Sequence, residues 1–85
     1  MDEIKLAILR DVGLANNGYV TMHGTMANVR NAVKGSTLSG VRDAFTDLVK
    51  HRHLVLLGTD RAGQEYYCLP EKKHLILQMM EDLTR

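Results

Sequence analysis

The sequence predicts a single domain of the α+β class, and three observations lead to that prediction. Apolar residues recur at helical spacing in three separate segments of residues 1–51. Two short β-prone segments follow, joined by a segment rich in turn-forming residues, and residues 71–84 return to a helical pattern. Because 85 residues support only one hydrophobic core, we expect one unit with about 5,000 Å² of folded surface.

The first helix is expected over residues 3–16. Ile4, Ile8 and Val12 recur every four residues and so define one narrow apolar face. The segment Asn16-Asn17-Gly18 ends this helix, because Asn and Gly tolerate the left-handed conformation that helix ends adopt. Residues 19–22 are β-prone and predict a short extended stretch.

Two further helices are expected over residues 23–33 and 37–51, separated by a turn at 34–36. Ser36 or Thr37 is suited to cap the second of them, since its hydroxyl can accept from amides of the first turn. Spacings of three and four assign the buried positions of both helices. These positions are Met22, Met26, Val29 and Val33 in the first, and Leu38, Val41, Phe45 and Leu48 in the second.

After residue 51 the pattern changes to a β-hairpin, with strands expected over 53–57 and 65–69. Asp60 and Gly63 occupy the first and last positions of a type I turn between them. Pro70 ends the second strand, because proline cannot donate a hydrogen bond to a neighbouring strand. Cys68 is expected on the inward side, where it acts as a small apolar residue.

The last helix, expected over residues 71–84, is apolar around more than half of its circumference. Contact with one small core does not require so wide an apolar face. Two interpretations follow: the helix forms a homodimer, or it covers the first helix and the sheet of its own chain. The residues expected at the dimer interface are Leu75, Ile76, Met79, Met80 and Leu83.

The net charge is only +1, but its distribution along the chain is uneven. Residues 28–61 carry six basic and three acidic residues, whereas both ends are slightly acidic. Such a distribution can direct a basic face toward phosphates. The apolar runs are too short for a bilayer, the N-terminus lacks a basic leader pattern, and the single cysteine is atypical of a small secreted domain. We therefore expect a cytoplasmic protein without membrane contact.

Catalysis and metal binding are not expected. The four histidines and Cys68 show neither CxxC nor HxxxH spacing. The segment from Gly58 to Gly63 is not followed by the Lys-Ser/Thr of a phosphate-binding loop. Asp43 and Asp47 lie one helical turn apart, but the surrounding sequence does not predict a pocket. We expect no enzymatic activity, no cofactor and no small-molecule substrate.

In its order of elements, the chain resembles the winged helix-turn-helix fold. The Lys34-Gly35-Ser36 turn, the helix from Ser36 to Leu48 and the hairpin ending at Leu69 carry this resemblance. It implies a winged helix-turn-helix domain over residues 1–70, with 71–85 as an added C-terminal helix. It also implies sequence-specific binding of double-stranded DNA by a transcriptional regulator of prokaryotic, archaeal, plasmid or viral type, which would be associated with the nucleoid.

The same resemblance implies which residues meet DNA. In the family, the helix equivalent to 37–51 enters the major groove, and the hairpin equivalent to 53–69 forms the wing. Arg42 is suited to bidentate contact with guanine, and Arg61 matches the wing arginine that reaches a minor groove or a phosphate. The residues expected to face base edges are Thr37, Ser39, Gly40, Arg42 and Thr46, and those expected at phosphates are Lys34, Lys50 and Arg52.

Asp43 and Asp47, which follow Arg42 along the same helix, leave a second interpretation open. Carboxylates close to phosphates raise the electrostatic energy of a complex. Either both aspartates point away from DNA, or this helix meets a different partner. The alternative function is therefore a winged-helix module for protein–protein contacts within a larger assembly.

Overall fold

The computed structural model describes residues 2–84, with the side chains of residues 2–81. These residues form four α-helices, one 3-10 helix and a three-stranded antiparallel sheet, which confirms the α+β class. In chain order the elements are α1 (Glu3–Gly13), β1 (Tyr19–Val20), α2 (Met22–Ala32), α3 (Leu38–Lys50), β2 (Val55–Thr59), β3 (Glu65–Cys68), the 3-10 helix η1 (Pro70–Lys72) and α4 (Lys73–Thr84).

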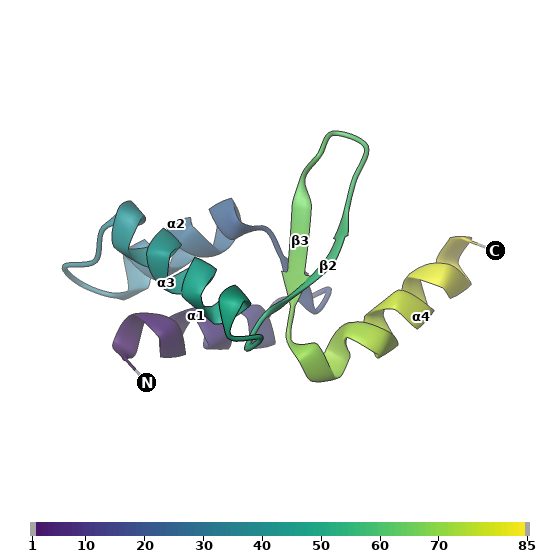
Figure 1. Ribbon diagram of the computed structural model, residues 1–85, viewed down its shortest axis with the longest axis horizontal. Coiled ribbons are helices and arrows are strands. Elements are labelled where there is room, and N and C mark those ends of the chain that lie inside the picture. Colours follow the sequence, from purple (N-terminus) through teal and green to yellow (C-terminus); the bar gives the residue numbers. More distant parts are fainter. Residues whose placement is uncertain (1, 85) are drawn as a thin grey trace.

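Helices α1, α2 and α3 pack around one core at one end of the molecule (Figure 1). Phe45 of α3 lies at its centre, where its ring meets the ring of Tyr67 edge to face at 5.1 Å. Beside this apolar core, Asp11 of α1 accepts hydrogen bonds from Thr25 (2.8 Å) and Asn28 (3.1 Å) of α2. These bonds fix the two helices against each other and satisfy the hydroxyl of the fully buried Thr25.

The sheet has the order β1-β3-β2, so β3 is the central strand. Tyr19 pairs with Cys68 and Val20 with Tyr67, while β2 pairs with β3 through an irregularity between Leu56 and Gly58. In Figure 1 the hairpin β2–β3 rises beside the C-terminal end of α3, and its tip extends beyond the helices. The short strand β1 thus joins the helical layer to this hairpin.

Several boundaries and positions differ from the sequence prediction. α1 ends at Gly13 instead of residue 16, and β2 begins at Val55 instead of residue 53. The late start of β2 follows from the end of α3, because the amides of His53 and Leu54 both donate to the carbonyl of Leu48. Leu38, predicted to be buried, is 43% exposed because it lies in the first turn of α3 at the edge of the core.

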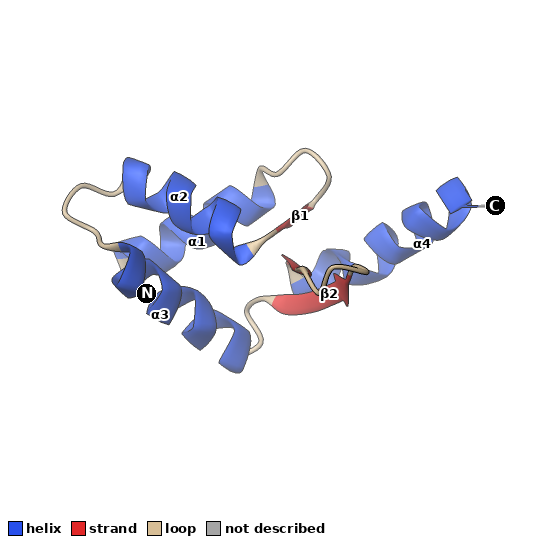
Figure 2. Ribbon diagram, turned by 90° about the horizontal axis from the view of Figure 1, so that it is seen from above, coloured by secondary structure: helices blue, strands red, loops and turns tan. Residues whose placement is uncertain are grey.

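Helix α4 extends away from the other helices instead of lying over α1 (Figures 1 and 2). Ile76 holds α4 against the sheet in a small cluster with Leu57 and Cys68. Cys68 is buried, as the sequence predicted. Ile76, which was expected at a dimer interface, has its side chain buried against its own sheet. The side chain of Leu83 lies outside the described residues. None of the helices within residues 2–84 is both long and apolar enough to cross a membrane.

Candidate nucleic-acid interface

The start of α3 is fixed by Thr37, whose side-chain oxygen accepts a hydrogen bond from the amide of Gly40 at 3.0 Å. This contact satisfies one of the amides that the first helical turn leaves without a partner. A Cβ atom at position 40 would lie 3.1 Å from the same oxygen, so glycine leaves room for the cap. Thr37 and Gly40, predicted to face DNA bases, therefore already have a structural role within α3.

α2 begins in the same way. Thr21 accepts from the amide of Gly24 at 3.1 Å, and a Cβ atom at Gly24 would lie 3.1 Å from the Thr21 hydroxyl. The pattern Thr-x-x-Gly therefore occurs at the start of both helices. This repeated pattern was the sequence signal that could have assigned Gly40 to capping.

The outward face of α3 is polar and open to solvent. Its core side holds Val41, Phe45 and Leu48, all fully buried, so the opposite side points away from the molecule. The exposed side chains on that outward half are Ser39, Arg42, Asp43, Thr46 and Lys50. Four of these five residues were predicted to contact DNA, and the structure places them on one continuous surface.

The two aspartates of α3 have different surroundings. Asp47 turns toward α1, where its carboxylate forms an ion pair and hydrogen bond with the ammonium group of Lys5. This hydrogen bond lowers the pKa of Asp47 and raises the pKa of Lys5. Asp47 is therefore engaged within the helical layer, whereas Asp43 stays exposed on the outward face beside Arg42.

The end of α3 places Arg52 in an unusual backbone conformation, with a φ of 61°. The amide of Arg52 donates to Val49 and the amide of His53 to Leu48, which is the Schellman arrangement of a helix end. Glycine usually occupies this left-handed position because it has no Cβ to clash. An exposed arginine here is strained, and strain of this kind gathers at functional positions.

The hairpin tip is organised by Asp60. One of its carboxylate oxygens accepts from the amides of Ala62 and Gln64, both at 2.9 Å, and the other accepts from the hydroxyl of Tyr66 at 2.9 Å. The predicted turn is present, since the amide of Gly63 donates to the Asp60 carbonyl. These donors, with Gln64 the strongest, lower the pKa of Asp60. Arg61 therefore projects from an ordered loop. The sequence prediction missed this role of Asp60. Aspartate is nevertheless a common turn residue, because its carboxylate can accept from the backbone amide two residues later.

Apart from Thr37 and Gly40, the residues predicted to contact DNA fall into three places. Ser39, Arg42, Thr46 and Lys50 share the outward face of α3, Lys34 and Arg52 lie in the loops at its two ends, and Arg61 lies at the hairpin tip. Lys34, Arg52 and Arg61 are all exposed. Figure 2 shows α3 on the outside of the helical layer, with the hairpin following its C-terminal end.

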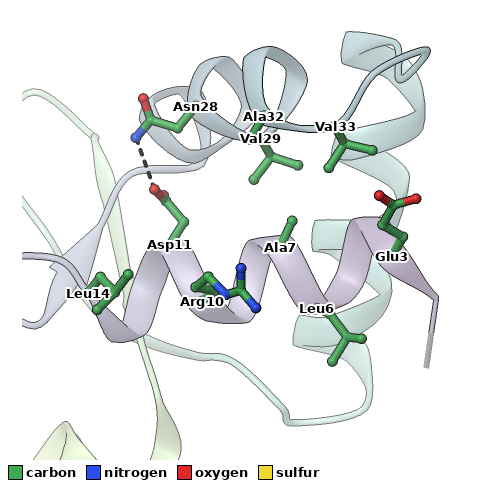
Figure 3. Close-up of a pocket in the computed structure, with 10 residues that line it drawn as sticks. All are labelled: Glu3, Leu6, Ala7, Arg10, Asp11, Leu14, Asn28, Val29, Ala32 and Val33. Carbon is green, nitrogen blue, oxygen red and sulfur yellow. Dashed lines mark hydrogen bonds between the residues drawn. The ribbon is translucent and has the colours of Figure 1, made fainter.

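A separate groove of about 420 Å³ runs between α1 and α2 (Figure 3). Its lining includes Ala7, Val29 and the two exposed leucines Leu6 and Leu14. The carboxylate of Asp11, which also lines the groove, accepts hydrogen bonds from Thr25 and Asn28. Within residues 2–81, no group of three or more His, Cys, Asp or Glu side chains is placed to hold a metal ion. The groove is therefore lined by apolar residues together with the charged Glu3 and Arg10, and its Asp11 carboxylate is already hydrogen-bonded within the fold.

Comparison of the chain with models of protein families, with curated protein sequences and with solved structures gives no match.

Proposed function

We propose that this chain is a winged-helix protein that binds double-stranded DNA, with α3 in the major groove and the hairpin β2–β3 as the wing. The observation that carries the proposal is the uncovered outward face of α3, on which Arg42 lies among short polar side chains. Arg42 reads base edges, with guanine as its preferred partner because a guanidinium donates two parallel hydrogen bonds to it. Ser39 and Thr46 flank it within the same groove.

The remaining basic residues position the protein on the phosphate backbone. Lys34 and Arg52 lie at the two ends of α3, Lys50 lies in its last turn, and Arg61 extends from the hairpin tip. These four cations serve as phosphate contacts, so the affinity depends strongly on salt. With about four phosphates neutralised per chain, the affinity falls about 100-fold between 50 and 200 mM salt.

Two substitutions on α3 test the division between reading and positioning. Binding sites are first selected from a pool of randomised duplexes, and the dissociation constant is then measured on the selected site and on mixed sequence. Arg42→Ala weakens the selected site by about 1–3 kcal/mol and relaxes its base preference, whereas Lys50→Ala weakens all duplexes alike and reduces the salt slope by about one. Equal losses on every sequence for both variants would contradict these roles.

Asp43 favours a second candidate function, contact with another protein. Its carboxylate is exposed on the same face as Arg42, where it repels phosphates but suits a partner of mixed charge. A titration against mixed-sequence duplex at low and high salt separates the two candidates. DNA binding gives a steep salt dependence, and a protein-contact module gives no binding at either salt concentration.

A further inference from the structure

Among residues 2–81, half of the exposed large apolar side chains lie on α4. Leu75 is 60% exposed, Met79 58%, Met80 44% and Leu77 41%. Within the same helix only Ile76 is buried among the described side chains. A helix of 12 residues is marginally stable in water by itself, so most of its stability must come from packing of its apolar face. The contact through Ile76 uses only a small part of that face.

The total accessible surface of the chain is larger than that of a compact monomer of the same mass. The chain exposes 6029 Å², whereas a compact monomer of its mass exposes about 5,000 Å². Its radius of gyration is 13.0 Å, compared with about 12 Å for a compact domain of this length. The excess of roughly 1,000 Å² is close to the 800 Å² that each partner buries in a standard interface.

A cleft of about 370 Å³ adjoins this helix and extends the apolar surface onto the sheet. Leu77 and Met80 of α4 form one wall, and Tyr19, Leu57 and Tyr66 form the other. The centroids of the Tyr19 and Tyr66 rings lie 5.6 Å apart in an edge-to-face arrangement, so the two side chains pack against each other in that wall. Leu77 and Met80 thus border the cleft, while Leu75 and Met79 are exposed elsewhere on α4; these four side chains and the cleft are together called the α4 face.

The charges along α4 indicate which partner fits. Around its start Glu71, Lys72 and Lys73 carry a net charge of +1, whereas Glu81, Asp82 and Arg85 around its end carry a net charge of −1. Two antiparallel copies of this helix place the basic start of each beside the acidic end of the other. A two-fold axis produces this arrangement, because each copy then presents the same patch to its partner.

We propose that the α4 face binds the α4 face of a second copy of this chain, forming a two-fold dimer with antiparallel α4 helices. The dimer buries Leu75, Leu77, Met79 and Met80 of both copies and fills each cleft with side chains of the partner helix. This proposal stands independently of DNA binding, because its observations come from α4 and the sheet alone.

Sedimentation of the full chain without DNA tests the proposal. The wild-type chain is expected to have twice its 9.6 kDa mass at high micromolar concentration. The double variant Leu75→Glu, Met79→Glu is expected to be monomeric, with a dissociation constant raised about 100-fold or more, because each charge enters the interface twice. Both side chains are exposed in the single chain, so the fold should tolerate the substitutions. The helical circular dichroism signal, most of which comes from α1, α2 and α3, should persist.

Leu14→Glu is the matched control. Leu14 is 76% exposed directly after α1 and does not line the cleft beside α4, so its substitution should leave the dimer intact. As a second measurement, the thermal midpoint of the wild type should rise with protein concentration, whereas that of the double variant should not. A monomeric wild type, a double variant that stays dimeric, or dissociation by Leu14→Glu alone would each overturn the proposal.

Discussion

Arg52 occupies a left-handed backbone conformation that glycine adopts with less strain. Substitution by glycine at this position is therefore expected to change stability and DNA affinity in opposite directions. A non-glycine residue in the left-handed region is less stable by roughly 1 kcal/mol. Arg52→Gly is therefore expected to raise the free energy of unfolding by about 1 kcal/mol, measured by urea denaturation. If the arginine contacts phosphate, the same variant binds DNA more weakly although it is more stable.

Arg52→Ala is the control, because it removes the guanidinium but keeps a Cβ in the left-handed position. It should lose DNA affinity as Arg52→Gly does, without the gain in stability. An unchanged free energy of unfolding in Arg52→Gly would show that the conformation is not strained.

Asp60 makes the hairpin sensitive to acid. Its pKa is lower in the folded chain than in the unfolded chain, because Gln64, Tyr66 and Ala62 donate to the carboxylate. The folded state therefore binds this proton less tightly, and the stabilisation is complete at neutral pH and is lost as the pH falls through the folded pKa. Thermal midpoints measured from about pH 6 to pH 2 should fall less steeply in Asp60→Asn than in the wild type.

Tyr66→Phe provides an intermediate case, since it removes one donor and leaves the two amide donors in place. Its pH dependence should lie between those of the wild type and Asp60→Asn. Identical profiles for all three chains would show that the Asp60 contacts do not contribute to stability.

At the scale of whole elements, the cap of α3 determines where the proposed recognition helix begins. Thr37→Ala removes the acceptor for the Gly40 amide and is expected to lower the free energy of unfolding by about 1 kcal/mol. Thr37→Asn keeps an acceptor and should lose much less. Both values come from denaturant unfolding, and equal losses in the two variants would assign the effect to side-chain volume instead of the cap.

The elements that the sequence predicted well are those whose signals are local. α3 was predicted within one residue at each end, because its buried positions follow helical spacing and Thr37 caps its first turn. β2 was placed two residues too early, since the apolar Leu54 belongs to the helix end, where its amide donates to Leu48. β1 was predicted as extended, but its pairing with β3 depends on residues almost fifty positions away.

The candidate site was predictable only in part, for the same reason. The exposure of Arg42, Thr46 and Lys50 follows from the spacing of the buried residues of α3. The ion pair between Lys5 and Asp47 joins residues 42 positions apart, and local periodicity carries no information about it. The left-handed conformation of Arg52 also escaped prediction, because an arginine gives no signal for it.

At the scale of the whole molecule, the chain has two unequal ends. The helical layer buries most of the core, whereas α4 rests on the sheet through Ile76 and extends the longest dimension to 45 Å. A two-fold pair through the α4 face would leave the outward faces of both α3 helices accessible. The proposed DNA contact and the proposed dimer therefore use different surfaces, and each can be tested in the absence of the other.

The pairing of β1 with β3 has a mechanical consequence. Only Thr21 separates β1 from α2. The hairpin is therefore connected to the helical layer through the pairing of Tyr19 and Val20 with β3. The distance between α3 and Arg61 is consequently set by the fold. A duplex gripped by both would have to adjust its own groove to that width, and sequences that bend easily would be favoured even at base pairs that no side chain touches.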